Sequence, residues 1–351
     1  MRIWRWLKHA LAILVTLCVL LLVPVAYIET VCRPGGAPVP YQSILPPEHH
    51  RPESRTLLTY PEWHIVHAYE DYGRVVKTGN PHDYGFLDGI AGFWGSLCSL
   101  SKASSQLGEV DFATKQMVYV IGVSFTAELL LKAAYEETVG RVFAGLRGDE
   151  RAPLDDLSAN QAQSYAAFLQ QTPWYKWDFR RDAAALSNAA TPALRDRERA
   201  IALGMEYRAK AAYAEVIAAA VSQVGPDELT LRMIVTGTGA TPEALAQHDG
   251  ATVVATHDSG IEIETPRYRV LTRLMQQLAE QGVDFVEIAG NDQIMFTLLS
   301  TEAVHPGAIH SRMRQGFDDY RHLVLIHVSE LGNSLRNLRN GTARLEHVHD
   351  Y

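Results

Sequence analysis

Histidine and carboxylate side chains of the kind that bind metals or transfer protons are concentrated in TYPEWHIVHAYEDY, residues 59–72. If this segment is a helix, His64, His67 and Asp71 are three and four residues apart and lie on one face. Neutral imidazoles and carboxylates are ligand types that zinc and iron prefer. The segment therefore predicts half of a metal or acid–base site, and the other half has to come from another element.

The best candidate partner is Glu128, the only charged residue between Met117 and Leu131. A carboxylate in such an apolar stretch has to be paired, protonated or bound to a ligand. We therefore predict that His64, His67 and Glu128 bind a metal inside a helical bundle. The sequence identifies no cofactor, and it leaves open whether the protein is an enzyme.

A purely structural role for the same residues is the alternative. Glu128, Lys132 and Glu136 are spaced by four and can form an ion-pair ladder along one helix. The sequence contains no HExxH, paired ExxH, CxxC or GxSxG motif that would favour catalysis. Two further histidines, His347 and His349, fall in the tail ARLEHVHDY, which we expect to be frayed and exposed.

The elements before this segment predict a membrane anchor. Residues 10–28 carry no charge and are almost long enough to span a hydrocarbon core as a helix. The basic flank MRIWRWLKH precedes them, so residues 1–30 form an anchor whose N-terminus is cytoplasmic. The body then lies on the periplasmic or extracellular side. A cleaved signal peptide is the alternative, and Pro24 fits its cleavage pattern poorly.

Composition and charge limit the classes of protein to which the chain can belong. Apolar residues make up 47% of the 351 residues and charged residues 21%, as in ordinary globular proteins. The formal charge is −8 although the first nine residues are basic, so the body disfavours nucleic acid as a partner. With Cys18 inside the apolar run, Cys32 and Cys98 are the only pair available for a disulfide between the other regions, and the sequence leaves that bond open.

Residues 31–55 contain six prolines between Pro34 and Pro52, which forbid a helix. A stiff spacer that lifts the body off the membrane and an arm that follows the body's surface both fit this composition.

Residues 56–225 read as a helical bundle. Thr59 and Pro61 predict a helix start, and Lys77 lies near its end. Further helices are predicted over residues 85–100, 111–146, 158–171 and 191–224. In the last helix an apolar stripe at three- and four-residue steps is expected to face the bundle core; it comprises Ile201, Met205, Ala209, Ala212, Val216 and Ala219.

Two parts of this region could contact a membrane or another protein. Residues 85–100 and 117–134 are short for membrane spans, so we expect core helices, and a membrane hairpin is the alternative. Trp174, Tyr175 and Trp177 stand with basic residues in QTPWYKWDFRRD. They predict a surface that binds a protein partner, or a loop whose aromatic rings fill the bundle.

Residues 226–300 change to strand periodicity. Strands and helices in the order βαββαβ, followed by one added strand, predict a ferredoxin-like domain. Residues 301–351 then predict a helix from Asp318 or Asp319 to Gly341 and a tail. The fold class is α+β.

The features together predict a single-pass membrane protein whose body has a non-catalytic binding or assembly role at the membrane surface. The alternative is a metal-dependent enzyme or sensor that uses His64, His67 and Glu128.

Overall fold

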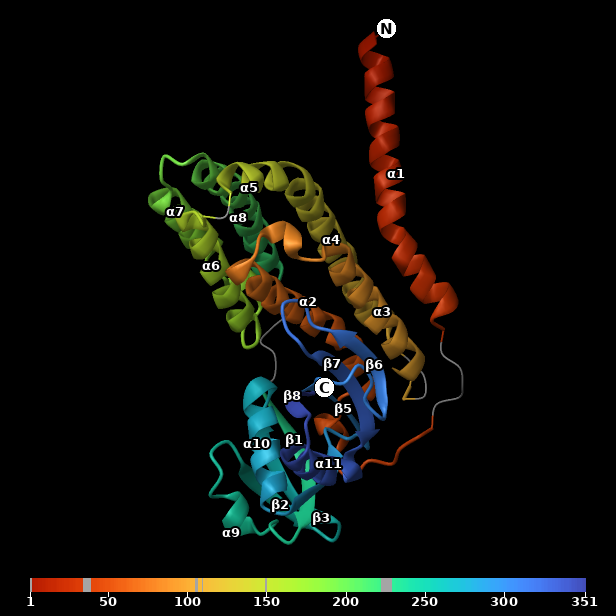
Figure 1. Cartoon of the computed structure of the whole chain (residues 1–351). Coiled ribbons are helices and arrows are strands. Elements are labelled where there is room, and N and C mark those ends of the chain that lie inside the picture. The colour runs from red at the N-terminus through yellow and green to blue at the C-terminus, as the bar shows by residue number, and fades with distance from the viewer. Residues whose placement is uncertain (1, 34–38, 105–106, 109, 149, 222–228) are drawn as a thin grey trace.

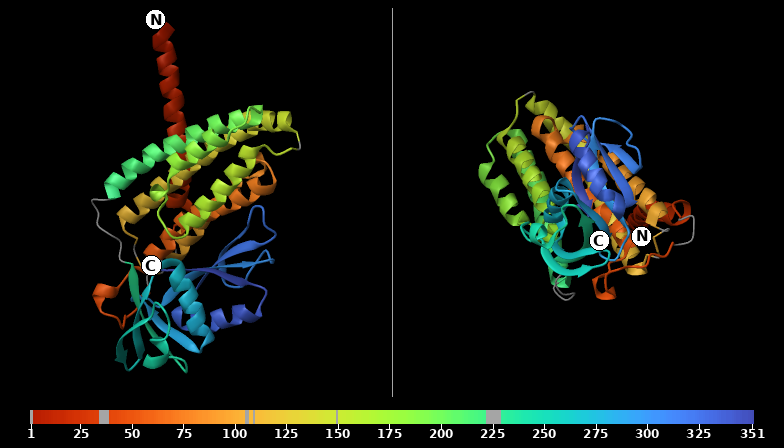
Figure 2. Two further views of the ribbon diagram at one scale, coloured as in Figure 1. Left: turned by 90° about the vertical axis from the view of Figure 1, so that its left-hand side faces the viewer. Right: turned by 90° about the horizontal axis from the view of Figure 1, so that it is seen from below.

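The computed structural model describes residues 1–351 except 1, 34–38, 105–106, 109, 149 and 222–228. A helical region lies next to a region of two antiparallel sheets, and the first helix projects from the helical end (Figures 1 and 2). Its helices are α1 (Arg2–Val31), α2 (Glu53–Thr78), α3 (Phe86–Ser104), α4 (Phe112–Tyr135), α5 (Arg141–Arg147), α6 (Pro153–Leu169), α7 (Phe179–Ala189) and α8 (Leu194–Val221). Short turns of helix cover Pro47–His49, Pro81–Asp83 and Trp174–Lys176, and a π-helical turn, Glu136–Gly140, joins α4 to α5.

Several helix boundaries follow the sequence, and three features differ from it. The helix α6 begins at Pro153, so the predicted start Ser158 lies inside it, and α7 was not predicted. As predicted, Asp111 caps α4, because its carboxylate accepts a hydrogen bond from Thr114 N at 2.8 Å. The helix α2, however, begins at Glu53, so Pro61 lies inside it and not in its first turn. A proline inside a helix costs one backbone hydrogen bond. Leu57, Leu58 and other neighbours of Pro61 are buried, and this packing offsets the loss.

The stripe predicted to face the core on α8 lies on the outside of the molecule. Ile201, Met205 and Val216 are 63%, 59% and 65% exposed. Ala211 and Ala214, on another side of the same helix, are buried instead. Because α8 carries small or apolar side chains on more than one side, periodicity alone could not decide which side packs.

The first sheet has the strand order β2-β3-β1-β4, and all its strands are antiparallel. The elements from residue 230 to residue 288 are β1 (Thr230–Gly237), α9 (Pro242–Leu245), β2 (Thr252–His257), β3 (Gly260–Pro266), α10 (Tyr268–Glu280) and β4 (Val283–Ile288). This is the predicted βαββαβ sequence of elements. Whether the domain is ferredoxin-like stays a prediction.

The second sheet corrects the C-terminal prediction. Its order is β6-β7-β5-β8, and its strands are β5 (Gln293–Ser300), β6 (Ala308–Met313), β7 (Tyr320–His327) and β8 (Arg344–His349). The strand added after the first six elements, β5, therefore belongs to this sheet. The predicted helix from residue 318 is a strand followed by the shorter α11 (Val328–Asn340), and the predicted frayed tail is β8. Pairing with β5 on both sides decides this, and such long-range pairing leaves no local signal.

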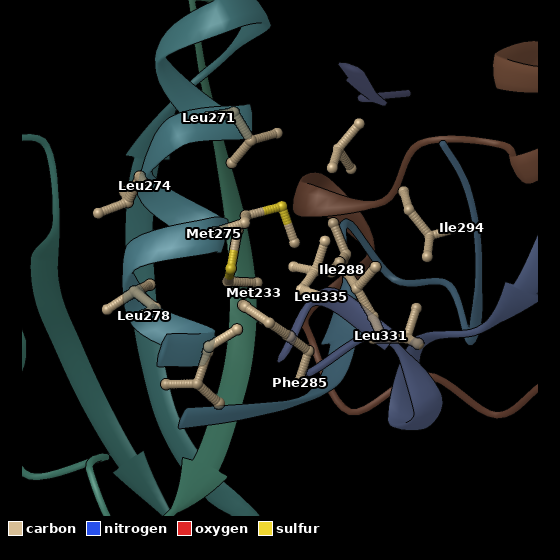
Figure 3. Packing of buried hydrophobic residues seen from close by; sticks show 14 of the residues in the cluster. Met233, Leu271, Leu274, Met275, Leu278, Phe285, Ile288, Ile294, Leu331 and Leu335 are labelled. Carbon is tan, nitrogen blue, oxygen red and sulfur yellow. The ribbon is translucent and has the colours of Figure 1, made fainter. Parts of the chain in front are cut away.

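The largest core lies between α10, α11 and the strands of both sheets. Figure 3 shows Met275 and Phe285 lying between α10 and Leu331, with Met233 and Leu278 in the same cluster. All five side chains are almost completely buried. This packing makes β4, α11 and the second sheet one unit, against which the helical region rests.

Two connections hold the N-terminal segments to the body. A disulfide joins Cys32 at the end of α1 to Cys98 in α3, with 5.1 Å between the Cα atoms. In the linker, Tyr41, Ser43, Ile44 and Leu45 all donate hydrogen bonds to the carboxylate of Glu287. The described part of this arm thus follows the surface of the body.

A third contact joins the start of α2 to the second sheet. The Glu53 carboxylate accepts hydrogen bonds from the backbone N of Asp292 and of Gln293, both at 2.9 Å. Burial is the main cause that raises the pKa of Glu53 to about 7, and it outweighs those two hydrogen bonds.

Length and apolar composition allow one helix of the described residues to cross a membrane. It is the continuous α4–α5 segment Phe112–Arg147, and a shorter apolar helical segment covers Val15–Val31 in α1. Core helices and signal sequences meet the same criterion, so membrane placement needs the further arguments given below.

Candidate functional site

A small cavity lies where α2 meets α3 and the second sheet. Its volume is about 20 Å³, which is room for one water molecule or one monatomic ion. His64, His67 and Asp71 all line it, so the predicted common face of α2 is confirmed. Opposite them stand Arg312 from β6 and Arg321 from β7.

His64 ties α2 to α3. Its Nε2 lies 3.0 Å from the carbonyl oxygen of Gly89, and it has to donate because that oxygen can only accept. The ring also packs edge-on against Phe93 and Phe125. Burial lowers the pKa of His64 well below its usual value, with Arg312 adding to the shift, so the imidazole is neutral at pH 7.

His67 has no such partner. Neither of its ring nitrogens has a hydrogen-bond partner among the residues that the structure describes, although the side chain is buried. Its Nδ1 lies 3.9 Å from Glu70 Oε2 and its Nε2 lies 3.7 Å from Glu346 Oε2. One ligand atom from each of the three residues lies within 4.8 Å of the others. Burial, followed by the charge of Arg321, lowers the pKa of His67 and keeps it neutral.

Two more buried histidines with unpartnered ring nitrogens stand beside this group. His347 and His349 are only 3% and 2% exposed, because the segment expected to fray is the strand β8. Their rings are 4.8 Å apart, and Trp63 packs on the His347 ring at 3.9 Å. His347 Nδ1 lies 3.1 Å from the hydroxyl of Thr272, whereas His347 Nε2 and both nitrogens of His349 have no hydrogen-bond partner within the described part of the chain. Burial lowers the pKa of His347 to about 3 and that of His349 well below its usual value.

Two arginines balance the carboxylates of the site. Arg321 donates to both oxygens of Glu346, at 2.6 and 2.7 Å, and lies 3.4 Å from Glu70. Arg314 donates to Glu70 at 3.0 Å. Burial would raise the pKa of Glu346, but the charge of Arg321 holds it well below its usual range. Burial raises the pKa of Asp71 to about 6 against the opposing charge of Arg321.

Glu128 lies in a different cluster, so the predicted set His64, His67 and Glu128 is not assembled. Its Oε1 lies 2.8 Å from Lys210 and 3.7 Å from Lys132, and Glu206 pairs with the same two lysines. The geometry therefore favours the structural alternative for Glu128, in which this residue forms an ion pair with Lys132. The predicted ladder does not continue to Glu136, which pairs with Arg199 instead, at 2.8 Å.

The aromatic segment between α6 and α7 also packs inward. Trp174, Tyr175 and Trp177 are partly buried against the aromatic cluster of α6, α7 and α8. The indole N–H of Trp177 donates to Asp182 at 2.8 Å. These contacts are those of a loop that fills the bundle, and binding of a protein partner by these residues stays a prediction.

Of the group His67, Glu70 and Glu346, the sequence pointed to His67 and missed the two carboxylates. Glu70 could have been predicted from the sequence, because this residue stands three positions after His67 on the same helix. Glu346 and Arg321 carried no local signal, since only the pairing of β7 and β8 with β5 brings them to α2. Comparison with protein-family models, curated protein sequences and solved structures found no match.

Proposed function

We propose that this protein is held in a membrane by α1 as a single-pass anchor, and that its body binds a divalent transition-metal ion on the non-cytoplasmic side. The anchor rests on the uncharged run of residues 10–28 behind a basic flank. The disulfide between Cys32 and Cys98 supports the side, because such bonds persist in oxidising compartments.

The observation that carries the metal site is the unpartnered imidazole of His67 between two carboxylates. A buried polar group without a partner costs free energy, and the ring nitrogens of His67 have none among the described residues. A metal ion supplies the missing partner. His67, Glu70 and Glu346 would be its ligands, because one ligand atom from each already lies within 4.8 Å of the other two. Only one ring nitrogen of His67 can bind the ion, so the side chains have to move closer together to form a tetrahedral site.

The charges of the site accept a cation. Glu70, Asp71 and Glu346 are opposed in direct ion pairs by Arg314 and Arg321, which leaves one net negative charge among these five groups when all are ionised, and Arg312 on the cavity wall offsets it. Each oxygen of Glu346 has a second lone pair besides the one that Arg321 uses. The neighbouring imidazoles of His347 and His349 are neutral and add no repulsion.

The burial of the ligand group favours binding over catalysis. His67 and Glu346 are mostly buried, and the adjoining cavity, which His67 lines but Glu70 and Glu346 do not, has a volume of only about 20 Å³. The proposed role of the ion is therefore to join α2 to β8 in a non-catalytic binding or assembly function. A metal-dependent enzyme or sensor is the alternative, and it requires the cavity to open beside Arg312.

The test is the metal content of the full-length chain, purified in detergent without a histidine tag and dialysed against zinc, manganese or ferrous iron. We expect about one ion per chain, lost in His67→Asn because the asparagine amide is a poor ligand for these ions. The matched control is His327→Asn, since the His327 side chain is 57% exposed at the end of β7. Wild-type protein that retains none of the three metals would refute the proposal, and a lowered melting temperature of His67→Asn would then assign His67 a packing role.

A further inference from the structure

The outer side of the helical region carries an apolar surface that the single-pass anchor does not use. Along α8 the exposed side chains Ile201, Met205 and Val216 form one stripe with Ala209 and Ala212 between them. These were the residues expected to pack in the core. A stripe of this kind on a helix surface is buried against something else in the working protein.

The α4–α5 segment extends this surface. Its outward side includes Val120, Leu131, Val142 and Leu146, all more than half exposed. In the fully described stretch from Phe112 to Arg147, the exposed charged residues are Glu137 and Arg141, and they pair with each other at 2.7 Å. The outward side of the α4–α5 segment is therefore without net charge, whereas α8 carries the exposed Arg197, Arg208 and Glu215.

Both helices lie at the end of the molecule from which α1 projects. Figure 1 places α5 and α8 at the upper edge of the helical region, and the left view of Figure 2 shows the N-terminal part of α1 rising above them. The segments α5 and α8 contact each other, and α1 contacts both α3 and α4. A bilayer that surrounds α1 is thus the nearest large apolar phase to this surface.

The length of α1 sets how far that bilayer reaches. The uncharged residues 10–28 span roughly 28 Å as a helix, close to the roughly 30 Å of a hydrocarbon core. Their last turn, however, is already beside the body: Val25 and Ile28 pack in the cluster of α3 and α4. Immersing the whole run therefore also immerses the part of the body that stands beside α1. The start of α4 is level with the end of the run, because Lys115 and Tyr119 contact Glu29, and Figure 1 shows α4 and α5 rising alongside α1 from there.

We propose that the apolar surface formed by α8 and the α4–α5 segment is embedded in the outer leaflet of the same membrane that holds α1. Arg197 and Arg208 are exposed along one edge of the α8 stripe, where their guanidinium groups can reach lipid phosphates, and Glu215 on the same edge is paired with Arg180. The Glu137–Arg141 pair removes the cost of two isolated charges at the surface. This inference rests on the proposed anchor and is independent of the metal site.

Spin labels on the full-length chain in lipid vesicles test the proposal. Single cysteines Met205→Cys and Leu131→Cys are made with Cys18→Ser, because Cys32 and Cys98 are joined in the disulfide and do not react with the label. Collisions with oxygen, which concentrates in lipid, are compared with collisions with a water-soluble nickel chelate. We expect oxygen to dominate at both positions. The matched control is Arg273→Cys on the exposed side of α10, where the nickel chelate should dominate.

A label on the native Cys18, which is exposed in α1, reports the anchor separately. Dominant collisions with the nickel chelate at positions 131 and 205, with Cys18 still in lipid, would overturn this inference and leave the anchor standing. Low collision rates with both reagents would also overturn it, because a second copy or another protein would then cover the surface. A Cys18 label in water would refute the anchor itself.

Discussion

Glu287 provides the sharpest test of how the linker is held to the body. Its carboxylate is completely buried and accepts four hydrogen bonds from the arm. Oε2 accepts from Tyr41 Oη at 2.8 Å and from Ile44 N at 2.6 Å. Oε1 accepts from Ser43 Oγ and Leu45 N, both at 2.8 Å. We predict that Glu287→Gln undocks this arm while the sheets stay folded.

The magnitude follows from the chemistry of the substitution. Glutamine keeps one acceptor oxygen but turns the other into an N–H₂ group that faces two donors. Two hydrogen bonds to a charged acceptor are lost, each worth about 1.5–3 kcal/mol. The donors of the partly exposed arm then form hydrogen bonds with water, which offsets part of this loss of free energy. The net cost of docking should be about 3 kcal/mol, which corresponds to a factor of roughly 100 in the docking equilibrium.

Hydrogen–deuterium exchange of the full-length protein measures this equilibrium directly. The amides of Ile44 and Leu45 should exchange roughly 100-fold faster in Glu287→Gln, because exchange follows local opening. Core amides of β1 and β4 should be unchanged. The matched control is Glu264→Gln, an exposed carboxylate of the same sheet that pairs with Arg232. Equal protection of the arm in Glu287→Gln and wild type would refute the assignment of Glu287 as its attachment point.

Three further predictions concern packing, pH and the disulfide. Gly92→Ala should lower the free energy of unfolding by about 1–3 kcal/mol, because a Cβ there would meet the Arg312 guanidinium. The control Gly145→Ala, with no atom within 4 Å of its new Cβ, should stabilise α5 by about 0.5–1 kcal/mol. An equal shift of the melting temperature in both variants would contradict the packing argument. Because the folded-state pKa of Glu53 is raised to about 7, the folded state binds more protons than the unfolded state between pH 4.5 and 7. Stability should therefore fall by about 2 kcal/mol as pH rises through that window, and denaturant titrations of Glu53→Gln should lack this slope. Breaking the disulfide with Cys98→Ala opens a loop between residues 66 apart in sequence and should cost about 4 kcal/mol, which urea unfolding of reduced and oxidised wild type checks independently.

The sequence alone determined the features that depend on short-range periodicity. Apolar spacing predicted α3, α4 and α8, strand alternation predicted β1 to β5, and the spacing of His64, His67 and Asp71 placed them on one face. These predictions hold because helix and strand geometry repeat within a few residues, so the sequence displays the pattern directly.

Only the tertiary structure decided which surfaces meet. The choice between Glu128 and Glu346 as the partner of His67 depends on β8 pairing with β5, across about 50 residues of chain. The same pairing buries His347 and His349, which local composition assigned to a frayed tail. For α8 the apolar stripe was correctly located and its contact was wrong, because periodicity reports that a helix has an apolar side and does not report whether protein or lipid covers it.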